Sequence, residues 1–308
     1  MSGKKSKVVV ICGPTGVGKT AVSLEIADRF CGEIIGADSM QVYRHMDIGT
    51  AKPTRYECAR IPHHMIDLIN PDESMDVARY ADLAHREVNR LFEKGVAPIV
   101  VGGTGLYIKG LIDGIFRAKF ENRSVRSHLE KAAALFGVGG LYQQLKARDP
   151  GAAGKIHPND RYRIIRALEV FETTGKTITE HHREHRFSGR RFKVLKIALR
   201  MDRDVLYHRI NDRCDAMITE GLVDETKRLL QMGYHKDLKS MHAIGYRHMI
   251  DFLSGRMPWN EAVRTFKRDT RRYAKRQLTW FKSDAETVWV DPGRIGHIRV
   301  LVERFLQT

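Results

Sequence analysis

A glycine-rich segment carries the clearest chemical signal in the chain. It matches the pattern GxxxxGK[ST] and consists of Gly13, Pro14, Thr15, Gly16, Val17, Gly18, Lys19 and Thr20. Glycines in this pattern let backbone N–H groups turn toward phosphate oxygens, the following helix adds the positive end of its dipole, and the lysine adds a charge. The threonine hydroxyl can help to hold Mg²⁺. The segment therefore predicts a pyrophosphate-binding loop, with Mg²⁺ as the expected cofactor and Thr20 as its ligand.

Asp38 is the second candidate for chemistry. It follows a short apolar run over residues 33–37 and stands beside Ser39 and Gln41. A carboxylate near a dense cationic loop stays ionised, so it can accept a proton or assist a metal ion. The alternative is an aspartate that only caps a turn after a strand. We favour the functional interpretation because of where the strands are expected to end.

The elements that must position these residues alternate along the chain. Apolar runs predict strands over residues 7–12, 33–37 and 97–101, and helical spacing predicts helices over 19–30 and 74–93. This alternation is typical of a parallel sheet with helices on both faces, which binds ligands beyond the carboxyl ends of its strands. The phosphate loop, Asp38 and Thr104 all follow such strands, so we expect them to converge.

One part of an ordinary nucleotide hydrolase is missing. Such enzymes normally carry a hydrophobic strand that ends in an acid, which positions Mg²⁺. Here the strand over 97–101 is followed by Gly102, Gly103 and Thr104. The loop is therefore expected to grip a pyrophosphate, whereas the reaction at that pyrophosphate stays open.

The remaining chain predicts a second, mainly helical domain. Residues 117–195 have helical patterning and are strongly basic, and the chain returns to the core with a strand over 194–199. The expected fold is α/β, a P-loop NTPase-like parallel sheet flanked by helices. Its core domain comprises residues 1–116 and 196–308. Helices are expected at the C-terminal end of this domain, including one over 259–281. Residues 117–195 are expected to form an inserted basic helical domain.

The positive charge is concentrated in two places. The formal net charge is +16, and residues 117–200 hold 19 basic against 8 acidic side chains, a net of +11. Residues 264–282 hold 8 against 1, a net of +7, which leaves the rest of the chain about neutral. Two basic stretches on a neutral body suit a polyanion such as nucleic acid, although a solvated charged surface is the alternative.

Other classes of protein and site are disfavoured. The apolar runs are too short for a membrane span, and residues 8–12 are too short for a signal peptide, so we expect a cytoplasmic protein. Four scattered cysteines predict neither a disulfide nor a zinc site. The adjacent His63 and His64 lack a third ligand at suitable spacing, so structural roles are favoured. A monomer without an obligate protein partner is expected.

Several segments in order resemble the tRNA dimethylallyltransferase (isopentenyltransferase) family. They are GPTGVGKT from 13, ADSMQVYRHMDIGTAKPT from 37, IPHHMIDLI from 61, GGTGLYIKGL from 102, HPNDRYRIIRALEV from 157, SMHAIGYR from 240 and KRQLTWF from 275. A lone P-loop is unspecific, but this ordered set is highly specific. The resemblance runs from the P-loop to Phe281.

The resemblance implies a prenyl transfer rather than nucleotide hydrolysis. The loop would hold the pyrophosphate of dimethylallyl diphosphate, which accounts for the missing acid. Asp38 would take a proton from N6 of the adenosine on the 3′ side of the anticodon in tRNA, with Thr20 beside Mg²⁺. Lys19 and an arginine would stabilise the departing pyrophosphate. Arg209 and Arg213 are spaced to share one face of a helix; Arg213 is favoured, with a surface ion pair as the alternative for either.

The resemblance also implies contacts with the tRNA anticodon stem-loop, whose target base is pulled from its stack. The inserted domain and the helix over 259–281 would form a basic clamp. The positions that match family residues facing tRNA are Asp38, Ser39, Met40, Gln41, Thr104, Arg126, Tyr162, Arg163, Ile164, Ile165 and Arg166.

Two other functions are compatible with parts of the pattern. A small-molecule or nucleoside kinase would use the P-loop for ATP and Asp38 to activate a hydroxyl, but it leaves both basic stretches without a role. A non-catalytic RNA-binding protein would retain a vestigial P-loop, and Asp38→Ala would then leave its cellular function intact.

Overall fold

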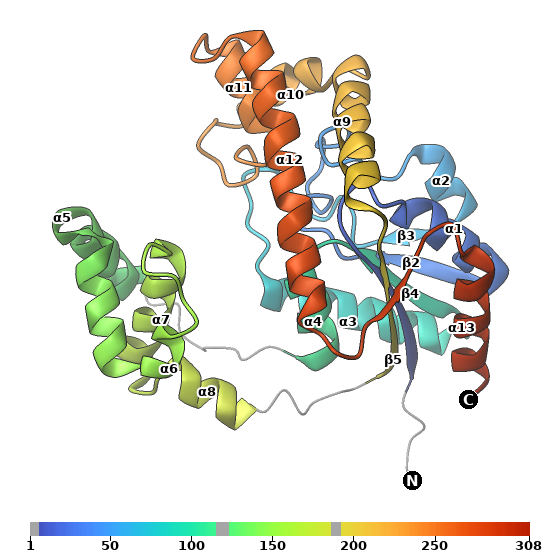
Figure 1. The fold of residues 1–308 in the computed structure, drawn as a ribbon, viewed down its shortest axis with the longest axis horizontal. Helices are drawn as coiled ribbons and strands as arrows, with labels where there is room; N and C mark the ends of the chain where they lie inside the picture. Colours follow the sequence, from blue (N-terminus) through green and yellow to red (C-terminus); the bar gives the residue numbers. More distant parts are fainter. Residues whose placement is uncertain (1–5, 115–122, 186–191) are drawn as a thin grey trace. The chain divides into compact units, whose positions relative to one another are not determined.

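The computed structural model describes residues 6–114, 123–185 and 192–308, which form two compact units (Figure 1). Unit 1 comprises Met1–Ile112 with Arg191–Thr308, and unit 2 comprises Asp113–Arg190. The boundary expected between residues 116 and 117 lies outside the described residues. The boundary expected between 195 and 196 falls inside a strand of unit 1.

Unit 1 is built on a six-stranded sheet whose neighbouring strands are all paired in parallel. The order across the sheet is β3-β2-β4-β1-β5-β6. The expected parallel sheet and its strands are confirmed, while β3 and β6 had no clear sequence signal. The strand bounds are β1 Lys7–Cys12, β2 Gly32–Gly36, β3 His63–His64, β4 Ala97–Gly102, β5 Lys193–Leu199 and β6 Val288–Val290.

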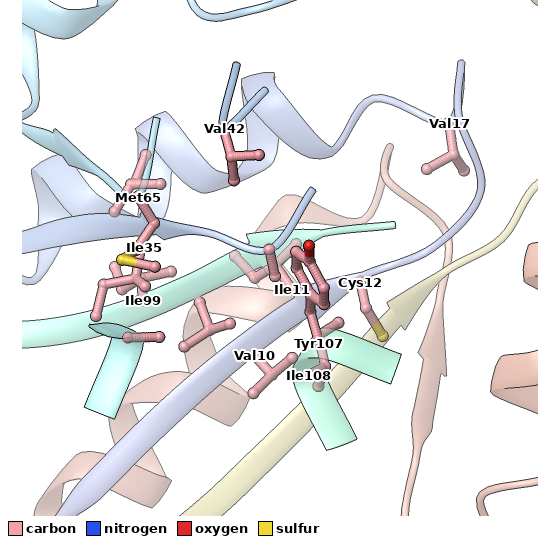
Figure 2. Close-up of a cluster of buried hydrophobic side chains, with 14 of the residues drawn as sticks. Val10, Ile11, Cys12, Val17, Ile35, Val42, Met65, Ile99, Tyr107 and Ile108 are labelled. Carbon is pink, nitrogen blue, oxygen red and sulfur yellow. The ribbon is translucent and has the colours of Figure 1, made fainter. Parts of the chain in front are cut away.

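The central strands β1 and β4 are apolar apart from Lys7 at the start of β1, as expected where both faces of a sheet are covered. Val8 and Val10 of β1 point to one face and Val9 and Ile11 to the other, and none of the four is more than 1% exposed. Val9 pairs with Ile99 of β4. Figure 2 shows the resulting cluster, in which side chains of β1, β2 and β4 pack with residues from the loops and from α4.

The helices of unit 1 lie on both faces of the sheet. The crossover from β1 to β2 and the one from β3 to β4 run in opposite directions across the sheet, so right-handed crossovers put α1 and α3 on opposite faces. α3 begins at Val77, where the Asp76 side chain accepts the N–H of Arg79, so the helix start expected at residue 74 was too early. The bounds are α1 Lys19–Arg29, α2 Arg55–Arg60, α3 Val77–Glu93, α4 Gly105–Asp113, α9 Arg203–Thr219, α10 Leu222–Gln231, α11 Tyr246–Leu253, α12 Trp259–Lys282 and α13 Ile295–Gln307.

Unit 2 is helical and has a core of its own. Its helices are α5 Arg123–Arg148, α6 Pro150–Ala153, α7 Arg161–Thr174 and α8 Ile178–His185. α5 and α7 pack together through apolar side chains, among them Leu129, Leu145, Ile164 and Leu168. α5 is interrupted at Gly137, whose φ of 77° and ψ of 163° are not helical. Across the described parts of both units, every helix is too short or too polar to cross a membrane.

Candidate active site

The phosphate loop connects β1 to α1 and depends on glycine at three positions. Gly13, Gly16 and Gly18 have φ values of 143°, 81° and 100°, which side chains other than glycine rarely adopt. A Cβ on Gly13 would also fall 2.9 Å from the carbonyl oxygen of Leu199 in β5. Within the described part of the chain, no side chain caps α1 at Gly18. The loop therefore leaves the N-terminal N–H groups of α1 available for an anion.

Lys19 is a half-buried cation at the base of this loop. Its Nζ donates to the carbonyl oxygens of Gly13, at 3.1 Å, and Pro14, at 2.8 Å. Burial, and then the charge of Arg213, lowers the pKa of Lys19 to about 8, although the charge of Asp38 opposes this shift. At pH 7 Lys19 is therefore still mostly protonated, in surroundings with little water to screen it.

Asp38 comes two residues after the end of β2, and its Oδ1 accepts the N–H of Met40 at 2.8 Å. This is the turn-capping contact that the alternative interpretation expects. It also fixes the carboxylate, which lines a cavity together with Lys19 and Thr20. Capping and a chemical role are therefore compatible at this position.

One cavity of about 1050 Å³ in unit 1 brings most of the expected site residues together. It is lined by the phosphate loop, by the segment from Asp38 to Gln41 and by residues of α9 and α12. Thr104 is not part of the wall, but its Oγ1 accepts the N–H of Ser39 at 3.0 Å. The expected residues in the wall are Thr15, Gly16, Gly18, Lys19, Thr20, Asp38, Ser39, Met40, Gln41, Arg209 and Arg213.

Both arginines of α9 reach this cavity. Arg213 is half-buried; burial lowers its pKa and the charge of Asp38 raises it. Arg209 is more exposed, and its Nη2 lies 3.7 Å from the position that a Cβ on Gly18 would occupy. Lys19 and Arg213 thus both lie within electrostatic reach of Asp38, and Arg209 adds a further positive charge to the wall.

The remaining expected contacts with RNA lie in unit 2. The guanidinium of Arg126 lies 5.4 Å from the ring centre of Tyr162, which is 64% exposed. Arg163 is exposed and Arg166 is half-buried beside Glu169. Ile164 and Ile165 are buried, so their side chains pack in the core of unit 2 and present no surface to a ligand.

His63 and His64 form β3 at the edge of the sheet. The Nδ1 of His63 lies 2.7 Å from the carbonyl oxygen of Ile61, and the Nε2 of His64 lies 2.6 Å from Glu33 Oε2. Burial lowers the pKa of His63. Among the residues that the structure describes, no three His, Cys, Asp or Glu side chains gather into a metal-binding group.

The wall nevertheless offers oxygen ligands that suit Mg²⁺. This ion is usually held by one or two carboxylates together with substrate phosphates and water. The hydroxyl of Thr20 and the carboxylate of Asp38 both line the cavity. They are hard oxygen donors next to a loop with the shape of a phosphate site, so the residues present fit the ion.

Residues that the sequence did not single out as functional hold the site together. Gln277 of α12 is 6% exposed and bonds to both the phosphate loop and the loop after β4. Glu225 of α10 accepts backbone N–H groups from residues 47, 48 and 49, which belong to the segment that follows Asp38. Gln277 lies in the segment KRQLTWF and Glu225 in none of the segments named above, and neither role could be assigned without knowledge of the distant partners.

A glycine-rich phosphate loop at the carboxyl edge of a parallel sheet, opening on a cavity with one aspartate and several cations, places the chain in the P-loop class of α/β proteins. Comparison with known proteins narrows this class. The sequence model of the family described as IPP transferase matches residues 41–284. The chain therefore belongs to the IPP transferase family.

Relatives and solved structures agree with this assignment. The chain is 51% identical over 304 residues to the tRNA dimethylallyltransferase of Desulfosudis oleivorans, covering 98% of this chain and 97% of the relative. The structure resembles the tRNA isopentenylpyrophosphate transferase of Bacillus halodurans with a TM-score of 0.73 and 44% identity, covering 98% and 97% of the two chains. It also resembles a eukaryotic dimethylallyltransferase acting on tRNA, with a TM-score of 0.79 and 29% identity, covering 93% and 74%.

Proposed function

We propose that the chain transfers a dimethylallyl group from dimethylallyl diphosphate to N6 of the adenosine on the 3′ side of the anticodon in tRNA, releasing pyrophosphate. The observation that carries the proposal is one cavity lined by the phosphate loop, by its lysine Lys19 and by Asp38, in a chain of the IPP transferase family. The new bond joins N6 to the allylic carbon, the bond from that carbon to the diphosphate oxygen breaks, and one N6 proton is lost.

The cations of the cavity stabilise the leaving group. An exocyclic adenine amine is a poor nucleophile, so most of the barrier must be lowered at the departing pyrophosphate and by holding the two reacting atoms close. Lys19, the N-terminus of α1 and Arg213 supply positive charge where negative charge develops, and Arg209 extends this surface. When bound, Mg²⁺ held by Thr20 would neutralise further charge on the phosphate oxygens.

Asp38 is the proposed general base. Its carboxylate faces the cavity that contains Lys19 and Thr20, and the N–H of Met40 holds it in place. Ser39, Met40 and Gln41 follow it in the cavity wall and would border the extruded base. The adjacent Thr104 keeps the Ser39 backbone in position.

Each unit by itself presents basic residues for contacts with the anticodon stem-loop. α12 carries seven basic residues between Arg264 and Arg276, against one acid, Asp269. In unit 2 the stacked pair of Arg126 and Tyr162 offers a platform of the kind on which RNA bases stack, and Arg163 and Arg166 add charge. Ile164 and Ile165 support this surface from inside, because they are buried beneath it.

The test incubates purified protein with unmodified tRNA, Mg²⁺ and dimethylallyl diphosphate labelled in the prenyl group. The proposal predicts label in tRNA without any ATP, and loss of the label when the target adenosine is replaced by guanosine. ATP consumption without transfer of label would support the kinase instead. Binding of tRNA with neither reaction would support the non-catalytic RNA-binding protein.

A further inference from the structure

Gln277 is a buried amide that connects two loops of the site. It lies on α12 and is 6% exposed. Its Oε1 accepts the N–H of Thr15 in the phosphate loop at 2.9 Å, and its Nε2 donates to the carbonyl oxygen of Gly103 at 3.0 Å. A single side chain therefore ties the phosphate loop to the loop after β4.

These partners allow only one orientation of the amide. The N–H of Thr15 can only donate and the carbonyl of Gly103 can only accept, so a flipped amide would lose both bonds. The approach is also close, since a Cβ on Gly103 would fall 2.1 Å from Nε2 of Gln277. The glycine and the glutamine are thus matched in shape as well as in hydrogen bonding.

The loop after β4 continues this connection toward Asp38. The residue after Gly103 is Thr104, whose N–H donates to the carbonyl oxygen of Ala37 at 3.1 Å. Its Oγ1 accepts the N–H of Ser39 at 3.0 Å. The backbone on both sides of Asp38 is therefore held by the same short loop that Gln277 anchors.

We propose that Gln277 is a positioning residue that sets the phosphate loop and the Asp38 segment at the spacing the reaction needs. The inference rests on the proposed function, because it assigns the leaving group to one loop and the base to the other. An apolar side chain of similar size would pack in the same place. Such a side chain could satisfy neither the donor on one loop nor the acceptor on the other, whereas the amide satisfies both.

Two substitutions separate positioning from packing. Gln277→Leu keeps most of the volume and removes both hydrogen bonds, and Gln277→Glu keeps the shape and removes the donor whenever the carboxyl is ionised. Gln231→Glu, at the exposed end of α10, makes the same chemical change away from the cavity and serves as the control. The variants are compared by the single-turnover rate of prenyl transfer and by pyrophosphate binding.

The rate is expected to fall more than the affinity. Misplacement of reacting groups by about 1 Å can cost about a hundredfold in rate. We therefore expect Gln277→Leu to lower the single-turnover rate by about tenfold to a hundredfold. Its affinity for pyrophosphate should change less than about threefold, because Lys19 and the glycine turns of the loop are untouched. Gln231→Glu should leave both unchanged.

The pH profile of Gln277→Glu separates the two roles, because a residue that only fills space would not make the rate ratio depend on pH. A protonated glutamic acid reproduces the amide, since its O–H can donate to Gly103 and its C=O can accept from Thr15. The ratio of the variant's rate to the wild-type rate should therefore rise as pH falls. Other titratable and charged groups of the cavity wall are present in both proteins, so the wild type measured at each pH is the reference. They are Lys19, Glu25, Asp38, Glu57, Arg60, Arg209, Arg213, Cys214, His242, Tyr273 and Arg276.

Amide exchange at single residues tests the connection without any reaction. In Gln277→Leu the N–H of Thr15 should exchange faster with solvent, and the amide resonance of Ser39 should shift with it. Wild-type rates in a folded Gln277→Leu variant, a pH-independent ratio for Gln277→Glu, or an unchanged Thr15 amide would each overturn the inference. If instead the wild-type protein transferred no prenyl group while the two amides responded together, the proposed function would fail and the mechanical link would stand.

Discussion

Glu225→Gln should destabilise unit 1 and weaken the site, although it changes only one atom of a side chain. The carboxylate is 2% exposed and meets four donors. Its Oε2 accepts the N–H groups of Asp47 and Ile48 at 3.0 and 2.9 Å. Its Oε1 accepts the N–H of Gly49 at 3.1 Å and the hydroxyl of Tyr246 at 2.7 Å. Burial, and then the charge of Glu225, raises the pKa of Tyr246, which keeps its phenol a donor.

The size of the expected loss in stability follows from the backbone donors that Glu225→Gln leaves unpaired. The amide NH₂ of glutamine cannot accept, so one orientation strands the N–H of Gly49 and the other strands those of Asp47 and Ile48. Each unpaired buried donor costs about 1–3 kcal/mol, and the remaining bonds lose the strength that the charge gave them. We expect the free energy of unfolding to fall by roughly 2–5 kcal/mol, the sum of these contributions.

Urea denaturation of both proteins measures this change directly. The control is Glu303→Gln on α13, an exposed position where a change of less than about 0.5 kcal/mol is expected. Prenyl transfer should also fall, because the amide of Gln41 donates to the carbonyl oxygens of Thr50 and Ala51 in the same segment. If Glu225→Gln were as stable as Glu303→Gln, the buried carboxylate would not hold this segment and the reasoning would be refuted.

Three further predictions concern charge and space in the site. The value of kcat/KM for dimethylallyl diphosphate should fall as pH rises through about 8, since burial lowers the pKa of Lys19 to about 8 in the free enzyme. Deprotonation of Lys19 removes a positive charge that would face the phosphates. A flat profile from pH 7 to 9 would contradict this prediction. Gly102→Ala should lower the melting temperature, because the new Cβ would fall 2.0 Å from a carbonyl oxygen, whereas Gly139→Ala, with open space around it, should not. Arg213→Lys should lower kcat/KM by about tenfold because the planar fork is lost, and steady-state kinetics should show a smaller loss for Arg209→Lys, which starts from a more exposed position.

The parts of this molecule that could be predicted are those whose signals come from residues close together in the sequence. The apolar run of β1, the glycine pattern after it and the helical spacing of α3 each depend on neighbouring residues, and the structure confirms these elements. Since carboxyl ends of parallel strands meet at one edge, the approach of Asp38 to the phosphate loop was predictable too. The exact start of α3 was not, because Ser74 and Asp76 are both residue types that cap helices, and it is the side chain of Asp76 that accepts the N–H of Arg79.

The supports of the site depend on partners far away in the chain. Gln277 bonds to Thr15, 262 residues earlier, so its position on an otherwise apolar helix face gives no sign of its partner. In the sequence, Glu225 has the features of an ordinary surface residue in the first turn of a helix. Its partners, which include the N–H of Gly49, are known only from the structure. Likewise β3 is two residues long, and only its pairing with β2 defines it as a strand.

The central claim is that Asp38 accepts a proton beside a cradle that neutralises a departing diphosphate. The most direct measurement is the single-turnover rate of prenyl transfer by Asp38→Asn, with pyrophosphate and tRNA binding measured on the same preparation. The account predicts a rate lower by about 10²–10⁴, the usual contribution of a general base, with both affinities close to those of the wild type. A variant that binds both ligands and transfers the prenyl group at the wild-type rate would contradict it.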